Sequence, residues 1–132
     1  MRAVIADTGP LYASFDTSDQ YHKQAQLELR ELQQQKLGVL VTYPTVLESY
    51  SLVLQRFNTR LAQRFLQTLR SGTTVVKLID RDYLNAMQLV SSYLDQKITL
   101  FDGLTAIVSK RLSLPIWTYD YHFDIMGVQV WR

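Results

Sequence analysis

The stretch Ala3-Val4-Ile5-Ala6-Asp7-Thr8-Gly9-Pro10 decides how this chain of 132 residues begins to fold. Its four consecutive apolar residues predict a short buried strand, which Asp7 ends. Gly9 and Pro10 then favour the start of a helix. The apolar run is too short for a signal peptide or a membrane span, so we expect a cytoplasmic protein with no membrane contact.

The rest of the chain alternates between two apolar patterns. Further strands are predicted over residues 39–41, 73–79, 115–118 and 128–131. Helical spacing covers residues 19–36, 44–57, 61–72, 80–95 and 102–112. Strands that alternate with helices predict an α/β protein with a short, mostly parallel sheet of about five strands, covered on both faces. In the helix over 80–95, the inward residues are expected to be Tyr83, Met87, Val90 and Leu94.

The amino-acid composition excludes several kinds of chemical site. The chain has 14 basic residues, 12 acids and no cysteine, and 47% of it is hydrophobic. It can therefore bury a core, but it cannot form disulfides, thiolate zinc sites or cysteine nucleophiles. Its length and lack of linkers predict a single domain over residues 1–132. His22 and His122 do not have the spacing of a zinc site.

Four acids occupy positions that suggest a site. Asp7 and Asp120 each follow a predicted strand, so both are expected at the ligand-binding edge of a parallel sheet. Glu48 lies off the apolar stripe of its helix, and Asp102 starts another helix. Each acid alone is equally explained as a helix cap or turn residue, since Thr45 and Thr99 precede two of them at capping-box spacing. Seven other acids are expected on the surface: Asp16, Asp19, Glu28, Glu31, Asp80, Asp82 and Asp95.

If the four acids converge, their repulsion needs compensation. Two carboxylates about 4 Å apart repel by roughly 4 kcal/mol at an effective dielectric of 20. Protonation or a bound cation would relieve this repulsion. Oxygen ligands without cysteine suit Mg²⁺ or Mn²⁺. Such ions activate water and neutralise a phosphoryl transition state, so the pattern predicts metal-assisted phosphodiester hydrolysis.

The order of Asp7, Glu48, Asp102 and Asp120 resembles that of the PIN-domain ribonucleases, closest to the VapC-type toxins of toxin–antitoxin pairs. The resemblance covers nearly the whole chain and rests on motifs at residues 4–11, 19–25, 45–48, 102–106 and 118–128. One departure is Gly103, where Ala is more usual in the family.

This resemblance implies a three-layer α/β/α PIN-like fold and an endoribonuclease that cuts RNA. Mg²⁺ or Mn²⁺ would be held by Asp7, Glu48, Asp102 and Asp120, with Asp7 and Asp102 the strongest candidates for direct ligands. Thr8 and His122 are candidates to contact the ion or its ligands, although His122 is also explained as a packing or surface residue. A homodimer inhibited by a small antitoxin is implied as well.

Basic and aromatic residues supply candidate RNA contacts. Arg56, Arg60 and Arg64 recur every four residues, as a phosphate-binding stripe or a solvated helix face would. The other candidates are Lys110, Arg111, Tyr119 and Tyr121, whereas Tyr21, Tyr50 and Tyr83 are assigned to the core. If an ion holds the four acids, the rest of the chain carries 14 basic residues and only eight acids. This excess of positive charge favours a polyanionic substrate.

Two alternatives remain. A PIN-like module could bind RNA or protein without cutting it. Asp7-Thr8-Gly9 also matches the motif of retroviral-type aspartic proteases. Those proteases are all-β and glycine-rich, whereas this chain has several helical stripes and only five glycines.

Overall fold

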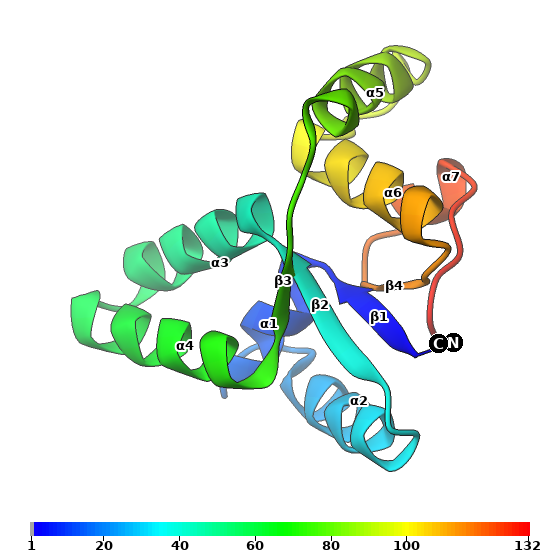
Figure 1. Ribbon diagram of the computed structural model, residues 1–132. Coiled ribbons are helices and arrows are strands. Elements are labelled where there is room, and N and C mark those ends of the chain that lie inside the picture. Colours follow the sequence, from blue (N-terminus) through cyan, green and yellow to red (C-terminus); the bar gives the residue numbers. More distant parts are fainter. Residues whose placement is uncertain (1) are drawn as a thin grey trace.

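A parallel sheet with helices on both faces forms the molecule (Figure 1). The computed structural model describes residues 2–132. The strands are β1 (Ala3–Ala6), β2 (Gly38–Thr42), β3 (Thr74–Val76) and β4 (Ile116–Trp117). The helices are α1 (Thr8–Phe15), α2 (His22–Gln34), α3 (Tyr43–Arg56), α4 (Thr59–Gly72), α5 (Asp80–Ser91), α6 (Leu100–Leu112) and α7 (His122–Ile125). The expected α/β class is confirmed.

The order of the strands is β3-β2-β1-β4, and every pair is parallel. The chain winds outward from β1 through β2 to β3, then crosses back to place β4 on the other side of β1. The winding direction therefore reverses between β1 and β4, and a crevice opens beyond their carboxyl ends. This is the place where the fold predicts a ligand site.

The expected fifth strand at 128–131 is reduced to one parallel bridge between Ile116 and Val130. The Ile116 N–H donates to the Gln129 carbonyl, and the Trp131 N–H donates to the Ile116 carbonyl. β4 is only two residues long, so it offers no further pairing positions to the terminal segment. The sheet of the described residues thus has four strands rather than about five.

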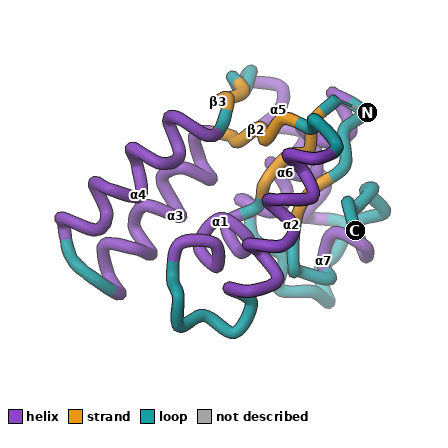
Figure 2. The backbone as a smooth tube through the Cα atoms, turned by 90° about the horizontal axis from the view of Figure 1, so that it is seen from below, coloured by secondary structure: helices purple, strands orange, loops and turns teal. Residues whose placement is uncertain are grey.

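Two core clusters confirm the three layers. The larger one joins β1 to α1–α4 and includes Val4, Ala6 and Trp117. The smaller one contains Ile116, Ala106 and Phe123 and covers the opposite face with α6 and α7. Ile116 and Trp117 are neighbours in β4 and enter different clusters, as expected when successive strand residues point to opposite faces. α3 and α4 project from the sheet as a packed pair (Figures 1 and 2).

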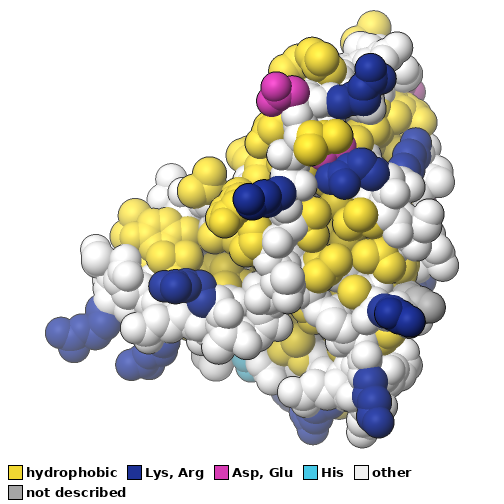
Figure 3. Space-filling view, in the orientation of Figure 1, with side chains coloured by type: hydrophobic (Ala, Val, Ile, Leu, Met, Phe, Trp, Pro, Cys, Tyr) yellow, Lys and Arg dark blue, Asp and Glu magenta, His cyan; other side chains and the backbone are white. Residues whose placement is uncertain are grey.

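Three of the four residues expected to face inward from α5 are exposed, and only Val90 packs against the smaller core cluster. Tyr83, Met87 and Leu94 are 41%, 53% and 90% exposed, and Leu94 lies beyond the end of the helix. The buried residues of α5 are Asp82 and Ala86. Hydrophobic side chains consequently gather on the surface over α5 (Figure 3). None of the helices in residues 2–132 is both long and apolar enough to cross a bilayer.

An ion pair between a buried carboxylate and the exposed Arg111 explains this change of face. Asp82 is 1% exposed, so its assignment to the surface is wrong. Its two carboxylate oxygens accept bonds of 3.0 and 2.9 Å from Nε and Nη2 of Arg111, a bidentate arrangement. Asp82 also accepts the N–H of Ile79 ahead of α5. The pair holds the side of α5 that carries Asp82 and Ala86 against α6.

Close approach of α5 and α6 accounts for Gly103. A Cβ atom there would lie 2.8 Å from Cγ2 of Val90 and 3.3 Å from the Ala86 carbonyl oxygen. Both distances are too short for an undisturbed contact. The departure from the usual Ala of the family therefore has a packing cause.

We predict that Gly103→Ala lowers the free energy of unfolding by about 1–2 kcal/mol, because overpacking outweighs the roughly 1 kcal/mol gained in helix propensity. Urea denaturation measures the change. Adding Val90→Ala should recover part of the loss, with Val90→Ala alone as the control. Equal or greater stability of Gly103→Ala would contradict the packing explanation.

Candidate active site

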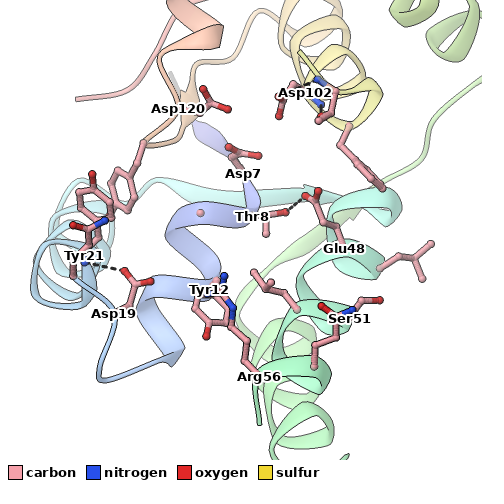
Figure 4. A pocket seen from close by; sticks show the side chains of 18 of the residues that line it. Asp7, Thr8, Tyr12, Asp19, Tyr21, Glu48, Ser51, Arg56, Asp102 and Asp120 are labelled. Atoms are coloured by element: carbon pink, nitrogen blue, oxygen red, sulfur yellow. Dashed lines mark hydrogen bonds between the residues drawn. The ribbon is translucent and has the colours of Figure 1, made fainter. Parts of the chain in front are cut away.

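The four singled-out acids converge on one cleft at the crevice between β1 and β4 (Figure 4). Asp7 follows β1, Asp120 follows β4, and the helices α3 and α6 bring Glu48 and Asp102. Their side chains face a common space. The cleft has a volume of about 950 Å³. The juxtaposition anticipated from strand ends and helix starts is therefore present.

Asp7 is the most buried of the four, at 9% exposure. It occupies the N-cap position of α1 but makes no side-chain hydrogen bond to the helix. Instead, its Oδ2 accepts a 2.8 Å hydrogen bond from Oγ1 of Thr118. Burial raises the pKa of Asp7 to about 7, and repulsion from Asp102 and Glu48 adds to the rise, while the Thr118 bond opposes it. Capping thus does not explain this acid.

Glu48 does not cap α3 either. The cap of α3 is Thr42, whose hydroxyl oxygen accepts the Thr45 N–H at 3.3 Å. The Glu48 carboxylate accepts a hydrogen bond from the hydroxyl of Thr8, at the start of α1. Thr8 therefore contacts a candidate ligand and orients it toward Asp7.

Asp102 combines a capping role with a place in the cluster. Its N–H donates to Oγ1 of Thr99 at 3.1 Å, and its Oδ2 accepts the Thr99 N–H at 3.4 Å. The capping-box expectation is confirmed here. Burial raises the pKa of Asp102, and repulsion from Asp120 and Glu48 raises it further. An ordinary cap residue would not be surrounded by other carboxylates.

Asp120 and His122 form the remaining side of the cluster. Asp120 Oδ1 accepts the backbone N–H of His122 at 2.9 Å, which is the expected turn role. His122 Nδ1 lies 3.0 Å from the same oxygen, is buried, and has no hydrogen-bond partner among the described residues. Ligand atoms of Asp102, Asp120 and His122 all lie within 4.8 Å of one another. His122 therefore belongs to the candidate site rather than to the open surface.

These donors fit a divalent cation. Four carboxylates surround one space, and the pKa values of Asp7 and Asp102 are raised. A buried imidazole nitrogen that makes no hydrogen bond within residues 2–132 lies beside Asp120. Oxygen donors predominate, which suits Mg²⁺ or Mn²⁺. A cation among these residues would offset the repulsion that adds to the effect of burial on the pKa values of Asp7 and Asp102.

The proposed RNA contacts divide into two groups. Arg56, Tyr119 and Tyr121 line the cleft. The guanidinium of Arg56 lies over the ring of Tyr12, 4.9 Å from its centroid, which holds the cation at the edge of the cleft. The candidates that do not line the cleft are Arg60, Arg64, Lys110 and Arg111. For Arg60 and Arg64 the structure supports the alternative of a solvated helix face.

Sequence reasoning missed three residues around the cleft. Asp19, assigned to the surface, lines the cleft, and Tyr21, assigned to the core, is 40% exposed and lines it too. Only the family resemblance of residues 19–25 singled out that segment. Glu28, also assigned to the surface, is partly buried and accepts hydrogen bonds from Trp117 and Tyr119. No spacing connects these residues, because 89 and 91 positions separate them.

The raised pKa of Asp7 predicts a pH-dependent stability. The folded protein binds this proton more tightly than the unfolded chain, whose value is near 3.8. The stabilisation by protonated Asp7 is therefore complete below pH 4 and is lost as pH rises toward 7. We expect Asp7→Asn, measured by urea denaturation in EDTA, to reduce this slope. It should be more stable than wild type at pH 8 by about 1–3 kcal/mol.

The exposed Asp95 provides the control, because Asp95→Asn should leave the slope unchanged. An Asp7→Asn protein that is no more stable than wild type at pH 8 would mean that Asp7 is not strained by burial.

Comparison with known proteins finds the same fold in two solved structures. No family model and no curated protein matches the chain. The structure of VapC20 from Mycobacterium tuberculosis, a sarcin-ricin loop cleaving toxin, superposes with a TM-score of 0.84 at 17% identity, covering 98% of this chain and 99% of that one. FitAcB from Neisseria gonorrhoeae gives a TM-score of 0.68 at 17% identity, covering 98% and 96%. The expected PIN-like fold, shared with VapC-type toxins, is confirmed.

Proposed function

We propose that this protein is a Mg²⁺- or Mn²⁺-dependent endoribonuclease. The observation that carries the proposal is the convergence of Asp7, Glu48, Asp102 and Asp120 in the cleft where the sheet reverses its winding. The shared fold with VapC20, a toxin that cleaves the sarcin-ricin loop, supports RNA as the substrate class. Fold alone does not determine function, so the acids carry the argument.

Each residue of the cluster has a part in this proposal. Asp7, Glu48, Asp102 and Asp120 hold the ion, and Asp7 and Asp102 contact it directly. Such an ion, when bound, supplies an activated water and neutralises charge on the phosphoryl oxygens. Thr8 orients Glu48 through its hydrogen bond. His122 supports Asp120 or adds a nitrogen ligand beside it.

Arg56 supplies positive charge at the edge of the cleft. No other Lys or Arg lines the cleft within residues 2–132. An arginine donates to phosphate with a rigid fork, and the ring of Tyr12 already limits its motion. We propose that Arg56 binds a backbone phosphate of the RNA while the scissile phosphate lies beside the acids that would hold the ion.

The two alternatives differ in how well they agree with the structure. A retroviral-type protease is all-β, whereas this chain has an all-parallel sheet covered by helices. That alternative also leaves Glu48, Asp102 and Asp120 without a role. A non-cutting RNA- or protein-binding module agrees with the fold, and cleavage assays distinguish it from the nuclease.

We predict RNA cleavage with Mg²⁺ or Mn²⁺ that EDTA abolishes. Asp7→Asn and Asp102→Asn should each reduce the rate at least about 100-fold, because each removes an acid that stabilises the transition state through the ion. Gel analysis of a labelled RNA measures the rate, and Asp95→Asn is the matched control. RNA that is bound but left intact with both metals would favour the binding module.

A small antitoxin and a second copy of the chain are the proposed protein partners. We expect expression of this protein to arrest bacterial growth, and co-expression of the product of a small adjacent gene to relieve the arrest. Asp7→Asn should be harmless, because toxicity requires cleavage. Growth arrest by Asp7→Asn equal to that by wild type would contradict the toxin mechanism.

The exposed apolar residues of α5 and α6 form the proposed dimer surface. The mass of the protein in solution, measured by sedimentation, tests whether two copies associate.

A further inference from the structure

Two tyrosines form one wall of the cleft beside the acids. The rings of Tyr21 and Tyr119 are stacked, with centroids 4.8 Å apart and planes 30° apart. Both rings line the cleft, and Tyr119 directly precedes Asp120. A Cβ on Gly9 would lie 3.9 Å from Cδ2 of Tyr119, so this ring also stands beside the first turn of α1, near Asp7. We call Tyr21 and Tyr119 the aromatic wall.

Glu28 in α2 holds the wall in place. Its Oε1 accepts a 2.5 Å hydrogen bond from the Tyr119 hydroxyl and a 3.0 Å hydrogen bond from Nε1 of Trp117. Trp117 belongs to β4 and is 1% exposed. One carboxylate oxygen thus ties the aromatic wall to a buried strand residue. The stacked Tyr21 restrains the ring of Tyr119 from a second direction.

Core packing accounts for Tyr119, which is partly buried against the larger core cluster, but not for Tyr21. Tyr21 keeps 40% of its surface exposed, although it was expected in the core, and it lies in the turn before α2. The wall contains no charge, and Arg56 is the only Lys or Arg that lines the cleft in residues 2–132. A rigid, uncharged aromatic surface suits a nucleobase better than it suits a phosphate.

We propose that the aromatic wall stacks an unpaired nucleobase adjacent to the scissile phosphate, with Glu28 as its positioning residue. This inference rests on the proposed nuclease function and adds the residues that select the conformation of the substrate. A base must leave its helix to stack on protein aromatics, so the wall favours loops and single strands over duplex RNA. Stacking is tolerant of sequence, because every base has a π face.

The test measures base stacking separately from cleavage. Asp7→Asn protein is titrated with a single-stranded RNA that contains 2-aminopurine, whose fluorescence is quenched when the base stacks. In this background, Tyr119→Leu and Tyr21→Leu should abolish the quenching and weaken binding about tenfold or more. Tyr119→Phe should keep the quenching, because it retains the ring. Tyr43→Leu is the control, since Tyr43 is exposed and lies outside the cleft.

The role of Glu28 has its own readout. Glu28→Ala should raise KM for RNA several-fold in the cleaving protein with little change in kcat, because the acids themselves are untouched. Glu28→Gln keeps an oxygen acceptor and should restore KM. A loss of kcat alone, or no rescue by Gln, would overturn the positioning role. Circular dichroism and thermal melting of each variant establish that it is folded.

The outcomes separate this inference from the nuclease proposal. Cleavage by wild type together with unchanged quenching and binding in Tyr119→Leu and Tyr21→Leu would overturn the aromatic wall and leave the nuclease standing. Quenching that depends on both tyrosines in a protein that never cleaves RNA would support the wall and overturn the nuclease. Equal affinity for duplex and single-stranded RNA would also count against the wall.

Discussion

The gathering of carboxylates at one edge of a parallel sheet, where burial and mutual repulsion both disfavour their charged form, is the constraint on which this structure depends. The reversal of winding between β1 and β4 places Asp7 beside the segment that carries Asp120. The hydroxyl groups of Thr118 and Thr8 donate hydrogen bonds to Asp7 and Glu48 and so hold these two carboxylates in the cluster. The fold therefore keeps, at this edge, buried carboxylates that cost stability, as expected where function and stability compete.

Aromatic and basic side chains of the cleft surround the four acids. Uncharged aromatic surface from Tyr21 and Tyr119 adjoins the acids, and Arg56 provides the cation at the rim. Glu28 holds Tyr119 from α2, so an element remote from the acids still shapes the site. We propose that the acids would hold an ion beside the scissile phosphate, while the wall and Arg56 fix the nucleotides around it.

The site residues that could be predicted from the sequence lie where strands end or helices begin. Asp7 and Asp120 were predictable because apolar strands end just before them, and parallel strands share one carboxyl edge. The exposed face of α5 was not, because periodicity cannot reveal that Gly103 permits a close approach to Ala86 and Val90. The Asp82 and Arg111 pair also escaped, since burial of an acid requires a partner 29 residues away. Pairings that depend on tertiary contact are invisible to local patterns.

The most direct test of the central claim is where a divalent ion binds. Crystals grown with Mn²⁺ can be measured for anomalous scattering from manganese. This account predicts a manganese peak within coordination distance of Asp7 and Asp102, and loss of that peak in Asp102→Asn crystals. Its absence from the acids of wild-type protein, with manganese bound elsewhere or not at all, would contradict the account.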